Sequence, residues 1–361
     1  MIRIETYNKI QLKELLDSDK FLSFDFLPIT KHRALSHIQN PRAKDEDILL
    51  TLALEEEKLA GYLGTFPDEI ITEENNIKFA WLSTLYINEN FRGKKIAQKL
   101  LDQAFLSYNN KIGITEFTKE AENLYRKTKK FNYINPKTGK RFYFRSNLDF
   151  FLPAKKSFFK KVKPILKIVD FCINTFNSIL NKTSKNLNFK YEIVKNIDEE
   201  SAKFIQSFEK NSTNRTSVEL NWILSNPWIL ESLATENNYL FSSFSKEFQY
   251  YVVKIYHEEK FSDLVILQLR DGHLKIPYLF SKNSLDCFVE FLGNFVQQRN
   301  IKFLTSYQTE LNKKILKKQK INFLYQKDFE RRYFMSNDLI EFLPKNYTFD
   351  FQDGDGDCIF T

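Results

Sequence analysis

The sequence predicts an α+β fold that is built twice, each copy with a central mixed, mostly antiparallel sheet flanked by helices. First, short apolar strand-like runs alternate with segments whose apolar residues recur at helical spacing. Second, residues 130–153 align with residues 320–344, as expected for two copies of one fold. The pairs that keep one offset of 190 residues are Tyr143 and Tyr333, Phe144 and Phe334, Ser146 and Ser336, and Asn147 and Asn337.

The elements of the first copy follow in a definite order. Strands are predicted at residues 2–7, 48–55, 58–65, 81–87, 112–117 and 141–145. Helices are predicted at residues 12–16, 21–37, 96–105 and 121–130. The run Asn-Pro-Lys-Thr-Gly at residues 135–139 predicts a turn before the last strand.

The second copy shows the same order. Strands are predicted at residues 191–194, 248–256, 264–270, 274–280 and 301–306, and helices at 199–208, 284–298 and 310–318. A chain of 361 residues suits two domains of ordinary size. The predicted boundaries are therefore 1–153, a connecting segment at 154–189, and 190–361.

The composition excludes several classes of protein. With 42% hydrophobic and 16% aromatic residues, the chain can bury cores and is not disordered. A net charge of +8 suits a polyanion, but Lys, Asn, Ile and Phe are all abundant, as in proteins from AT-rich genomes, so no nucleic-acid partner is expected. Three distant cysteines predict neither a disulfide framework nor a metal site. With no signal peptide or transmembrane run, we expect a cytoplasmic protein.

The residues 81–101 form the most informative stretch of the chain. A strand-like run ends in turn residues, and the basic sequence FRGKKIA then leads into an amphipathic helix. The first turn of a helix leaves backbone N–H groups unpaired, with the positive end of the helix dipole behind them. Such a site binds phosphate, and Arg92, Lys94 and Lys95 add positive charge around it.

This stretch resembles the acetyl-CoA signature of the GNAT superfamily of N-acetyltransferases, Arg/Gln-x-x-Gly-x-Gly/Ala. Here it reads Arg92-Gly93-Lys94-Lys95-Ile96-Ala97, with Lys95 in place of the central glycine. The resemblance covers residues 1–150. It implies that pyrophosphate binds at residues 92–97 and that pantetheine lies along Leu85, Tyr86 and Ile87, where one backbone amide polarises the thioester carbonyl.

A second part of the resemblance concerns the helix at 121–130. Ala121-x-x-Leu124-Tyr125, followed by Phe131, is similar to a GNAT pattern in which the tyrosine protonates the departing thiolate. The resemblance thus implies Tyr125 as general acid. The family's asparagine slot holds Thr118, so Asn123 is the candidate replacement.

The general base is less well defined by the sequence. Glu116, on the strand beside the site, is the first candidate, and Glu89 the second. His32 and His37 lie on the acceptor side, where each is either a substrate contact or a structural residue.

The second copy lacks these functional residues. SKNSLDC replaces FRGKKIA, and Ile315 falls at the position of Tyr125. The second domain is therefore predicted to be a degenerate GNAT-like domain.

Two further segments have alternative interpretations. Residues 154–189 combine a basic run with an amphipathic helix, which either lies on an anionic membrane or packs against the domains. We favour packing. The tail carries Asp353, Asp355 and Asp357. It is either a solvated acidic tail, which we favour, a group that recognises a cationic amine, or the start of an incomplete calcium loop.

The predicted function is transfer of an acetyl group from acetyl-CoA to an amine of a small molecule or peptide. Two alternatives stay open. One is a non-catalytic acyl-CoA-binding or regulatory module, and the other is a membrane-associated acyltransferase that uses longer acyl donors. The sequence determines neither the acceptor nor the oligomeric state.

Overall fold

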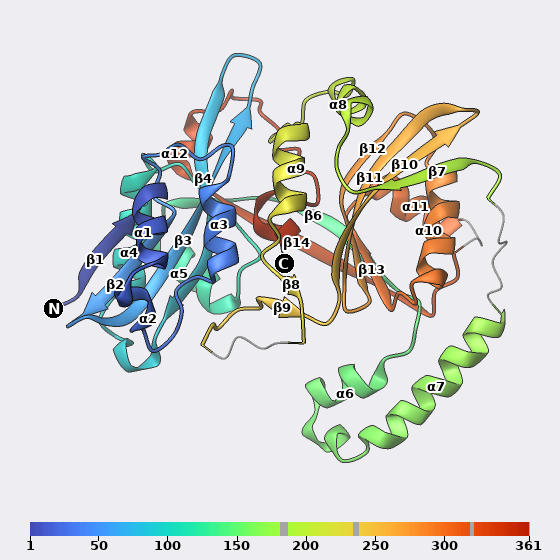
Figure 1. Cartoon of the computed structure of the whole chain (residues 1–361), viewed down its shortest axis with the longest axis horizontal. Helices are drawn as coiled ribbons and strands as arrows, with labels where there is room; N and C mark the ends of the chain where they lie inside the picture. Colours follow the sequence, from blue (N-terminus) through green and yellow to red (C-terminus); the bar gives the residue numbers. More distant parts are fainter. Residues whose placement is uncertain (181–186, 234–237, 318–320, 361) are drawn as a thin grey trace. The chain divides into compact units, whose positions relative to one another are not determined.

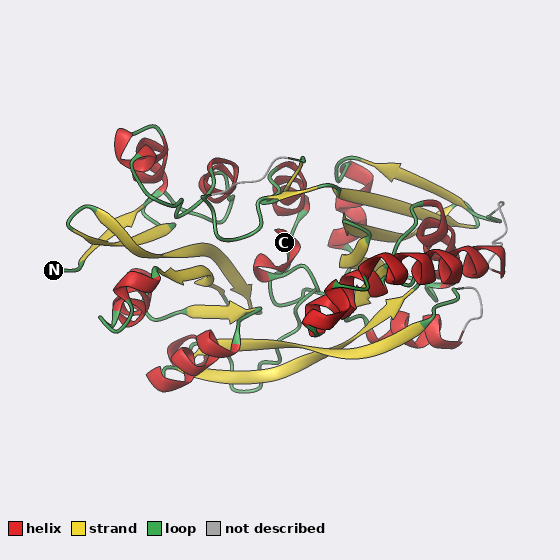
Figure 2. Ribbon diagram, turned by 90° about the horizontal axis from the view of Figure 1, so that it is seen from below, coloured by secondary structure: helices red, strands yellow, loops and turns green. Residues whose placement is uncertain are grey.

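A computed structural model describes residues 1–180, 187–233, 238–317 and 321–360. Its strands and helices form two compact units, each drawn from separate stretches of the chain (Figure 1; Figure 2). Unit 1 comprises Met1–Pro136, Asn196–Lys246 and Arg331–Thr361, and unit 2 comprises Lys137–Lys195 and Glu247–Glu330. Both units contain segments from both predicted copies. The boundaries 1–153, 154–189 and 190–361 stay a prediction about the order of the copies along the chain.

Unit 1 contains a mixed sheet with the strand order β1-β2-β3-β4-β5-β14. Every pairing is antiparallel except that of β4 with β5. The strands are β1 (Arg3–Tyr7), β2 (Leu50–Glu55), β3 (Lys58–Ile71), β4 (Asn76–Ile87), β5 (Ile112–Thr115) and β14 (Tyr325–Ser336), of which the last contributes residues 331–336 to this unit.

Helices cover both faces of the unit 1 sheet. On the first face, α4 (Ile96–Ser107) and α5 (Lys119–Thr128) bury their apolar residues against side chains of β3, β4 and β5. On the second face, α1 (Lys9–Leu16), α2 (Asp19–Leu22) and α3 (Lys31–Ile38) form another core with β2 and β3. This two-sided burial explains why β2 and β3 read as nearly continuous apolar runs.

Unit 2 has a sheet with the equivalent strand order, β7-β10-β11-β12-β13-β6. Its helices α10 (Asp286–Gln298) and α11 (Thr309–Lys317) bury apolar residues against that sheet. The strands are β7 (Lys190–Val194), β10 (Phe248–His257), β11 (Lys260–Arg270), β12 (His273–Ser281), β13 (Phe303–Ser306) and β6 (Phe131–Tyr143), of which β6 contributes residues 137–143.

The two copies exchange their last strands. β14, which ends the second copy, pairs with β5 in unit 1, where Tyr333 lies opposite Thr115. β6, which ends the first copy, pairs with β13 in unit 2, where Tyr143 lies opposite Phe303. The turn predicted at residues 135–139 is wrong, because these residues belong to β6. Sheet pairing here outweighs the local turn propensity.

Other predicted elements differ mainly in their ends. The fold class is confirmed. The hairpin of β3 and β4 is longer than predicted, because β3 extends to residue 71 and β4 begins at residue 76. The helix predicted at 21–37 is replaced by α2, a loop and α3. The predicted helix at 310–318 ends at residue 317, and its last residue lies outside the described residues.

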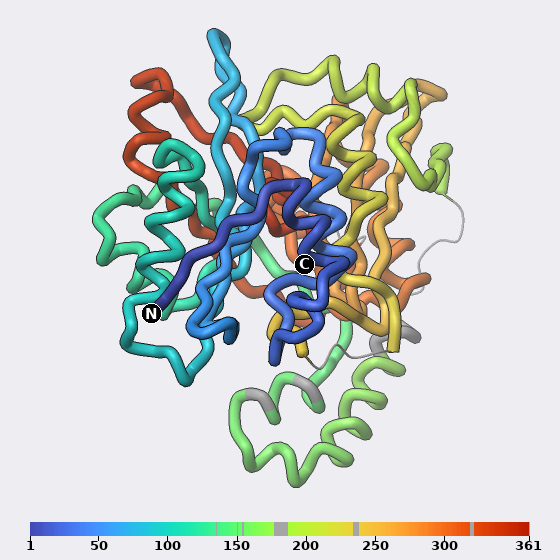
Figure 3. The backbone as a smooth tube through the Cα atoms, turned by 60° about the vertical axis from the view of Figure 1, so that its left-hand side comes forward, coloured from blue at the N-terminus to red at the C-terminus, as the bar shows by residue number. Residues whose placement is uncertain are grey.

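The remaining elements belong to one unit or the other. Unit 1 holds α8 (Glu199–Gln206), α9 (Ser217–Ser225), β8 (Leu230–Glu231), β9 (Phe244–Ser245), α12 (Asn337–Glu341) and the 3-10 helices η1 (Glu89–Phe91) and η3 (Gly356–Phe360). Unit 2 holds α6 (Leu148–Lys155), the 3-10 helix η2 (Ser157–Lys160) and α7 (Lys163–Leu180), which form a helical hairpin (Figure 3). Among the described residues, no helix is long and apolar enough to cross a membrane.

Candidate active site

The central strands of unit 1 part from each other near the middle of β4. β4 and β5 pair only at Ala80 with Ile112 and at Trp81 with Gly113. Three residues further on, β4 carries a bulge at Thr84, whose φ of +59° is left-handed. Gly64 on β3 faces this bulge, and a Cβ there would lie 2.5 Å from the carbonyl oxygen of Ser83. The bulge therefore depends on glycine, and it frees backbone groups from the ladder.

The bulge directly precedes the predicted donor-binding residues of β4. Leu85 and Ile87 border the core formed with α4 and α5, whereas Tyr86 borders the core of α1–α3. Leu85 and its neighbours still pair with β3, so the open edge of this segment faces β5.

The basic loop and the start of α4 follow this strand. Lys95 is the N-cap of α4 and has a left-handed backbone, with φ +57° and ψ +27°. This conformation explains why a glycine is favoured at the position. Ile96 is buried at the first turn, and Ala97 follows it at a partly buried position. The first N–H groups of α4 point out of its N-terminus.

Two basic side chains flank this N-terminus at the surface. Arg92 is 66% exposed and forms an ion pair of 3.1 Å with Glu89. Lys94 is 45% exposed and its Nζ lies 2.6 Å from Glu55. Gly93, between them, has φ +85°, and a Cβ added to it would meet no described atom within 4 Å. Together the loop offers positive charge and room for an anion at a helix N-terminus.

In the second copy, the position that corresponds to Lys95 has the same backbone conformation but an apolar side chain. Leu285, which follows Lys95 by 190 residues, is the N-cap of α10 and is also left-handed, with φ +61°. Its side chain is buried in the core of unit 2. Ile315, at the position of Tyr125, is buried there too. These two positions therefore carry apolar side chains where unit 1 has a basic residue and a tyrosine.

Helix α5 places Tyr125 against the first face of the unit 1 sheet. Thr118 caps the helix by accepting a hydrogen bond from the Ala121 amide. Tyr125 is 4% exposed, and its ring packs edge-on against Phe117 and Phe131. Burial raises the pKa of its hydroxyl, and the nearby Asp357 carboxylate raises it further. Tyr125 therefore holds its proton at neutral pH.

Asn123 does not lie beside Tyr125 on α5. Two residues of helix separate them by about 200° around the axis. Asn123 is accordingly exposed, on the opposite side of α5.

Glu116 follows β5 and has a left-handed backbone, with φ +54°. Its carboxylate accepts a hydrogen bond of 3.2 Å from the Nε of the buried Arg331. This contact occupies one oxygen of the Glu116 carboxylate.

The acidic tail is buried, so the expectation of a solvated tail is wrong. Arg215 donates to Asp355 at 3.2 Å and to Asp68 at 2.7 Å, and these three side chains are at most 2% exposed. The ring of Phe360 stacks on Trp228, with centroids 4.3 Å apart. Buried charges need such partners, and the apolar stack adds to the anchoring.

The end of this tail brings Asp357 to the gap between the strands. Helix η3 contacts both β4 and β5, and Thr115 on β5 contacts the sulfur of Cys358 at 3.7 Å. The Ser83 hydroxyl donates to Asp357 at 3.4 Å and itself accepts a hydrogen bond from Arg33. Burial raises the pKa of Asp357 to about 6, Arg33 opposes this rise, and Glu116 adds to it.

Asp357 and Tyr125 therefore lie on opposite faces of the parted strands. Successive strand residues point to opposite faces, and Leu82 belongs to the core of α4 and α5. Ser83, with Asp357, lies on the other face. Because the Asp357 carboxylate raises the pKa of Tyr125, the two groups are close enough to interact across the gap.

Neither histidine on the acceptor side is arranged as a catalyst. His37 is fully buried between Phe66 and Trp228, and its Nδ1 lies 3.1 Å from the carbonyl oxygen of Thr65. Burial lowers its pKa to about 3, so it stays neutral. His32 bonds to the backbone carbonyl of Trp228 at 2.8 Å.

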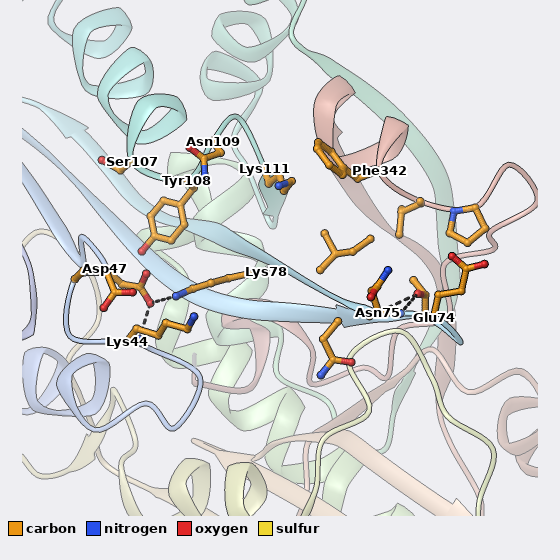
Figure 4. Close-up of a pocket in the computed structure, with 16 residues that line it drawn as sticks. Lys44, Asp47, Glu74, Asn75, Lys78, Ser107, Tyr108, Asn109, Lys111 and Phe342 are labelled. Atoms are coloured by element: carbon orange, nitrogen blue, oxygen red, sulfur yellow. Dashed lines mark hydrogen bonds and ion pairs between the residues drawn. The ribbon is translucent and has the colours of Figure 1, made fainter.

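A separate cavity of about 750 Å³ lies at the other ends of β4 and α4 (Figure 4). It is lined by Lys78 at the start of β4 and by Ser107 and Tyr108 at the end of α4. Twelve helical residues span about 18 Å, so this cavity is remote from the basic loop. Its Lys78 is neutralised by Asp47 at 2.6 Å. We assign it no role in the site.

Comparisons with known proteins bear on the family and the fold. Residues 11–129 match the model of the acetyltransferase (GNAT) family. This match identifies a GNAT acetyltransferase domain at residues 11–129, about a third of the chain, and supports an acyltransferase. The comparison with curated proteins finds no match.

Several solved structures share the fold at low sequence identity. A GCN5-related N-acetyltransferase from Anabaena variabilis is 13% identical with a TM-score of 0.51, over 92% of this chain and 72% of that one. A probable N-acyltransferase from Enterococcus faecalis is 11% identical with a TM-score of 0.53, over 96% and 75%. Saccharomyces cerevisiae N-myristoyltransferase with bound myristoyl-CoA is 10% identical with a TM-score of 0.50, over 93% and 79%.

The sequence did not identify Ser83, Thr84 or Arg33 as part of the site. Nothing in the local pattern distinguishes them, since each depends on the bulge or on a contact between distant segments. Asp357 did carry a signal, because the alternating aspartates of the tail are unusual.

Proposed function

We propose that unit 1 transfers an acetyl group from acetyl-CoA to an amine. The observation that supports this most directly is the opening between β4 and β5, with the bulge at Thr84 on its edge. One face offers Tyr125, a proton donor, and the other offers Asp357, a carboxylate. Acyl transfer from a thioester to an amine needs both kinds of group.

The donor would bind along the first face. The N–H groups at the start of α4, with Arg92, Lys94 and Lys95 beside them, would hold the pyrophosphate, and Gly93, Ile96 and Ala97 would supply backbone around it. Pantetheine would lie along Leu85, Tyr86 and Ile87, opposite β5. An amide of the bulge would then donate to the thioester oxygen as negative charge develops there.

The chemical step follows from the two faces of the gap. The amine nitrogen attacks the thioester carbon, the C–N bond forms, and the C–S bond breaks. The departing thiolate takes the proton of the Tyr125 hydroxyl. The nitrogen loses its proton to Asp357, whose pKa of about 6 suits a base at neutral pH.

We propose Asp357 rather than Glu116 as this base. Glu116 is bound to Arg331 at 3.2 Å, whereas the Asp357 carboxylate accepts a long hydrogen bond of 3.4 Å from Ser83 and one from its own backbone amide. Asp357 would also attract a cationic amine, which suits a small polyamine-like molecule or the amino group of a peptide. Asn123, on the exposed side of α5, has no place in this arrangement.

The test is release of free CoA thiol from acetyl-CoA in the presence of a panel of amines, with acyl-CoAs of increasing chain length in parallel. Tyr125→Phe and Asp357→Asn should each lower kcat by at least about 100-fold while acetyl-CoA still binds. Glu116→Gln is the matched carboxylate control and should retain most of the activity. Full activity in Asp357→Asn, with loss in Glu116→Gln, would assign the base to Glu116.

A non-catalytic acyl-CoA-binding module is the second candidate. The observation that favours it is Lys95 in the left-handed position that usually holds glycine. Calorimetry with acetyl-CoA separates the two, with Arg92→Glu as the loop variant and Lys203→Glu, an exposed site on α8, as the charge control. Binding that depends on Arg92 but comes without turnover for any amine would establish the binding module.

A further inference from the structure

Helix α7 of unit 2 packs through its polar residues. Asp170 accepts hydrogen bonds of 2.9 Å from the amides of Leu148 and Asp149, at the start of α6. Asn174 exchanges two hydrogen bonds with the backbone of Ser146, at 2.7 and 2.9 Å. These contacts cap α6 and fix α7 against it. The side of α7 that faces α6 is therefore its hydrophilic side, with Leu166 as the buried apolar residue between them.

The opposite side of α7 is apolar and exposed. We define the α7 stripe as Ile165, Ile168, Val169, Cys172 and Phe176, which recur at the spacing of one helix face. Ile165, Ile168 and Phe176 are 60–65% exposed, Val169 is 38% exposed, and Cys172 is also exposed. The expectation that these residues pack in an interior is therefore wrong. The part of the predicted connecting segment at 181–186 lies outside the described residues.

A cluster of lysines lies before the α7 stripe and within the first turns of α7. The exposed lysines in and before α7 outnumber the one carboxylate of residues 155–176, Asp170, which is buried against α6. Phe158, which is also exposed, lies within this basic run. The lysines are Lys155, Lys156, Lys160, Lys161, Lys163 and Lys167.

We infer that the hairpin of α6 and α7 docks on an anionic lipid bilayer, with the α7 stripe and Phe158 in the headgroup region and the lysines of residues 155–161 on lipid phosphates. An amphipathic helix with an apolar face and basic flanks binds in this way, lying in the interface and not crossing it. The positive charge of this segment favours an anionic bilayer over a second copy of the chain as the partner of the α7 stripe. Pairing two stripes would leave both basic runs without acidic partners in this segment, whereas an anionic surface attracts each of them.

This inference is independent of acyl transfer. It depends on residues of unit 2, and the groups assigned to the reaction all belong to unit 1. A protein without acyltransferase activity could still bind vesicles, and an active one could fail to bind them.

The experiment is co-sedimentation of the full chain with vesicles of phosphatidylcholine alone or with added phosphatidylglycerol, at low and high salt. We expect partitioning onto the anionic vesicles that weakens as salt rises. Lys160→Glu with Lys161→Glu should lower the partition coefficient more than tenfold, because each basic residue near an anionic surface contributes roughly fivefold.

The stripe is tested by a pair of matched phenylalanines. Phe176→Ser removes a stripe residue and should lower partitioning about tenfold or more. Phe171, which is 69% exposed, lies about 140° around the helix from Phe176 but only three residues from Ile168, at the border of the stripe, so Phe171→Ser should lower partitioning clearly less than Phe176→Ser does. Both residues are exposed, and unchanged circular dichroism would show that both variants fold.

Three results would overturn the inference. The wild type could fail to sediment with anionic vesicles, or Phe176→Ser and Phe171→Ser could bind equally well. Size-exclusion chromatography could instead show a dimer that Phe176→Ser converts to monomer, which would assign the stripe to self-association.

Discussion

Asp357 should make unit 1 less stable than it would be with a neutral residue in its place. A carboxyl whose pKa rises on folding favours its protonated form in the folded state. As pH increases from 3.8, the ordinary value, to about 6, the unfolded chain ionises first and the folded protein loses stability. Above that pH range, the folded protein carries the full free-energy cost of the ionised, partly buried carboxylate. Asp357→Asn removes it and keeps an acceptor for the Ser83 hydroxyl.

The magnitude follows from the two pKa values. A rise in the pKa of Asp357 from 3.8 to about 6 lowers the free energy of unfolding by about 3 kcal/mol at pH 8 and by about 1.6 kcal/mol at pH 5. These are upper values, because Asp357 is only partly buried by accessible surface and solvent weakens such effects. Asp357→Asn should therefore be more stable than the wild type at pH 8, with a smaller advantage at pH 5.

Urea unfolding followed by tryptophan fluorescence is a suitable assay. All three tryptophans, Trp81, Trp222 and Trp228, are buried in unit 1, so the signal reports on this unit alone. Asp102→Asn, an exposed carboxylate on α4, is the control and should change stability by less than about 0.5 kcal/mol. If Asp357→Asn is less stable than the wild type at pH 8, the carboxylate is a structural partner of Arg33 and not a base held at a cost.

Two further changes test the anchoring of the tail and the basic loop. Arg215→Leu removes the arginine partner of Asp355 and leaves Arg42 as the arginine partner of Asp68, so it should destabilise unit 1 by about 3–5 kcal/mol in the same urea assay. A loss below about 1 kcal/mol would show that the buried ion pairs contribute little. Lys95→Gly relieves a left-handed backbone and should add up to about 1 kcal/mol. In calorimetry with acetyl-CoA, Lys95→Asn, which tolerates the same backbone, isolates the charge; weaker binding by both variants would mean that Lys95 contacts the pyrophosphate, and tighter binding by both would mean that it obstructs the site.

The sequence alone was sufficient to predict those elements that are specified by residues close together along the chain. The strand at β4, the basic loop and α4 follow from apolar periodicity and from the phosphate-binding character of a helix N-terminus. Such features depend on residues that are neighbours along the chain. The left-handed backbone of Lys95 was not predicted, although the resemblance puts a glycine at this position.

Features that depend on distant pairing were not predictable in this way. Residues 141–144 and 331–334 carry similar strand patterns, so nothing local decides which of the two strands pairs with β5. The tail was misread because three aspartates in a row of small residues are typical of a solvated segment. Its burial depends on Arg215, more than a hundred residues earlier, and on the Trp228 ring.

The exchange of strands gives the second copy a physical role in the first copy's site. Phe334, on β14, stacks on Phe117 at 5.0 Å and lies edge-on to Tyr125 at 6.4 Å. Arg331, on the same strand, holds Glu116, and the tail that follows carries Asp357 to the gap. These three residues all follow the second copy's α11 in the chain. If the proposed mechanism is right, the predicted second copy would be required even without a phosphate loop and proton donor of its own, because its last strand and tail would supply groups to the site of unit 1.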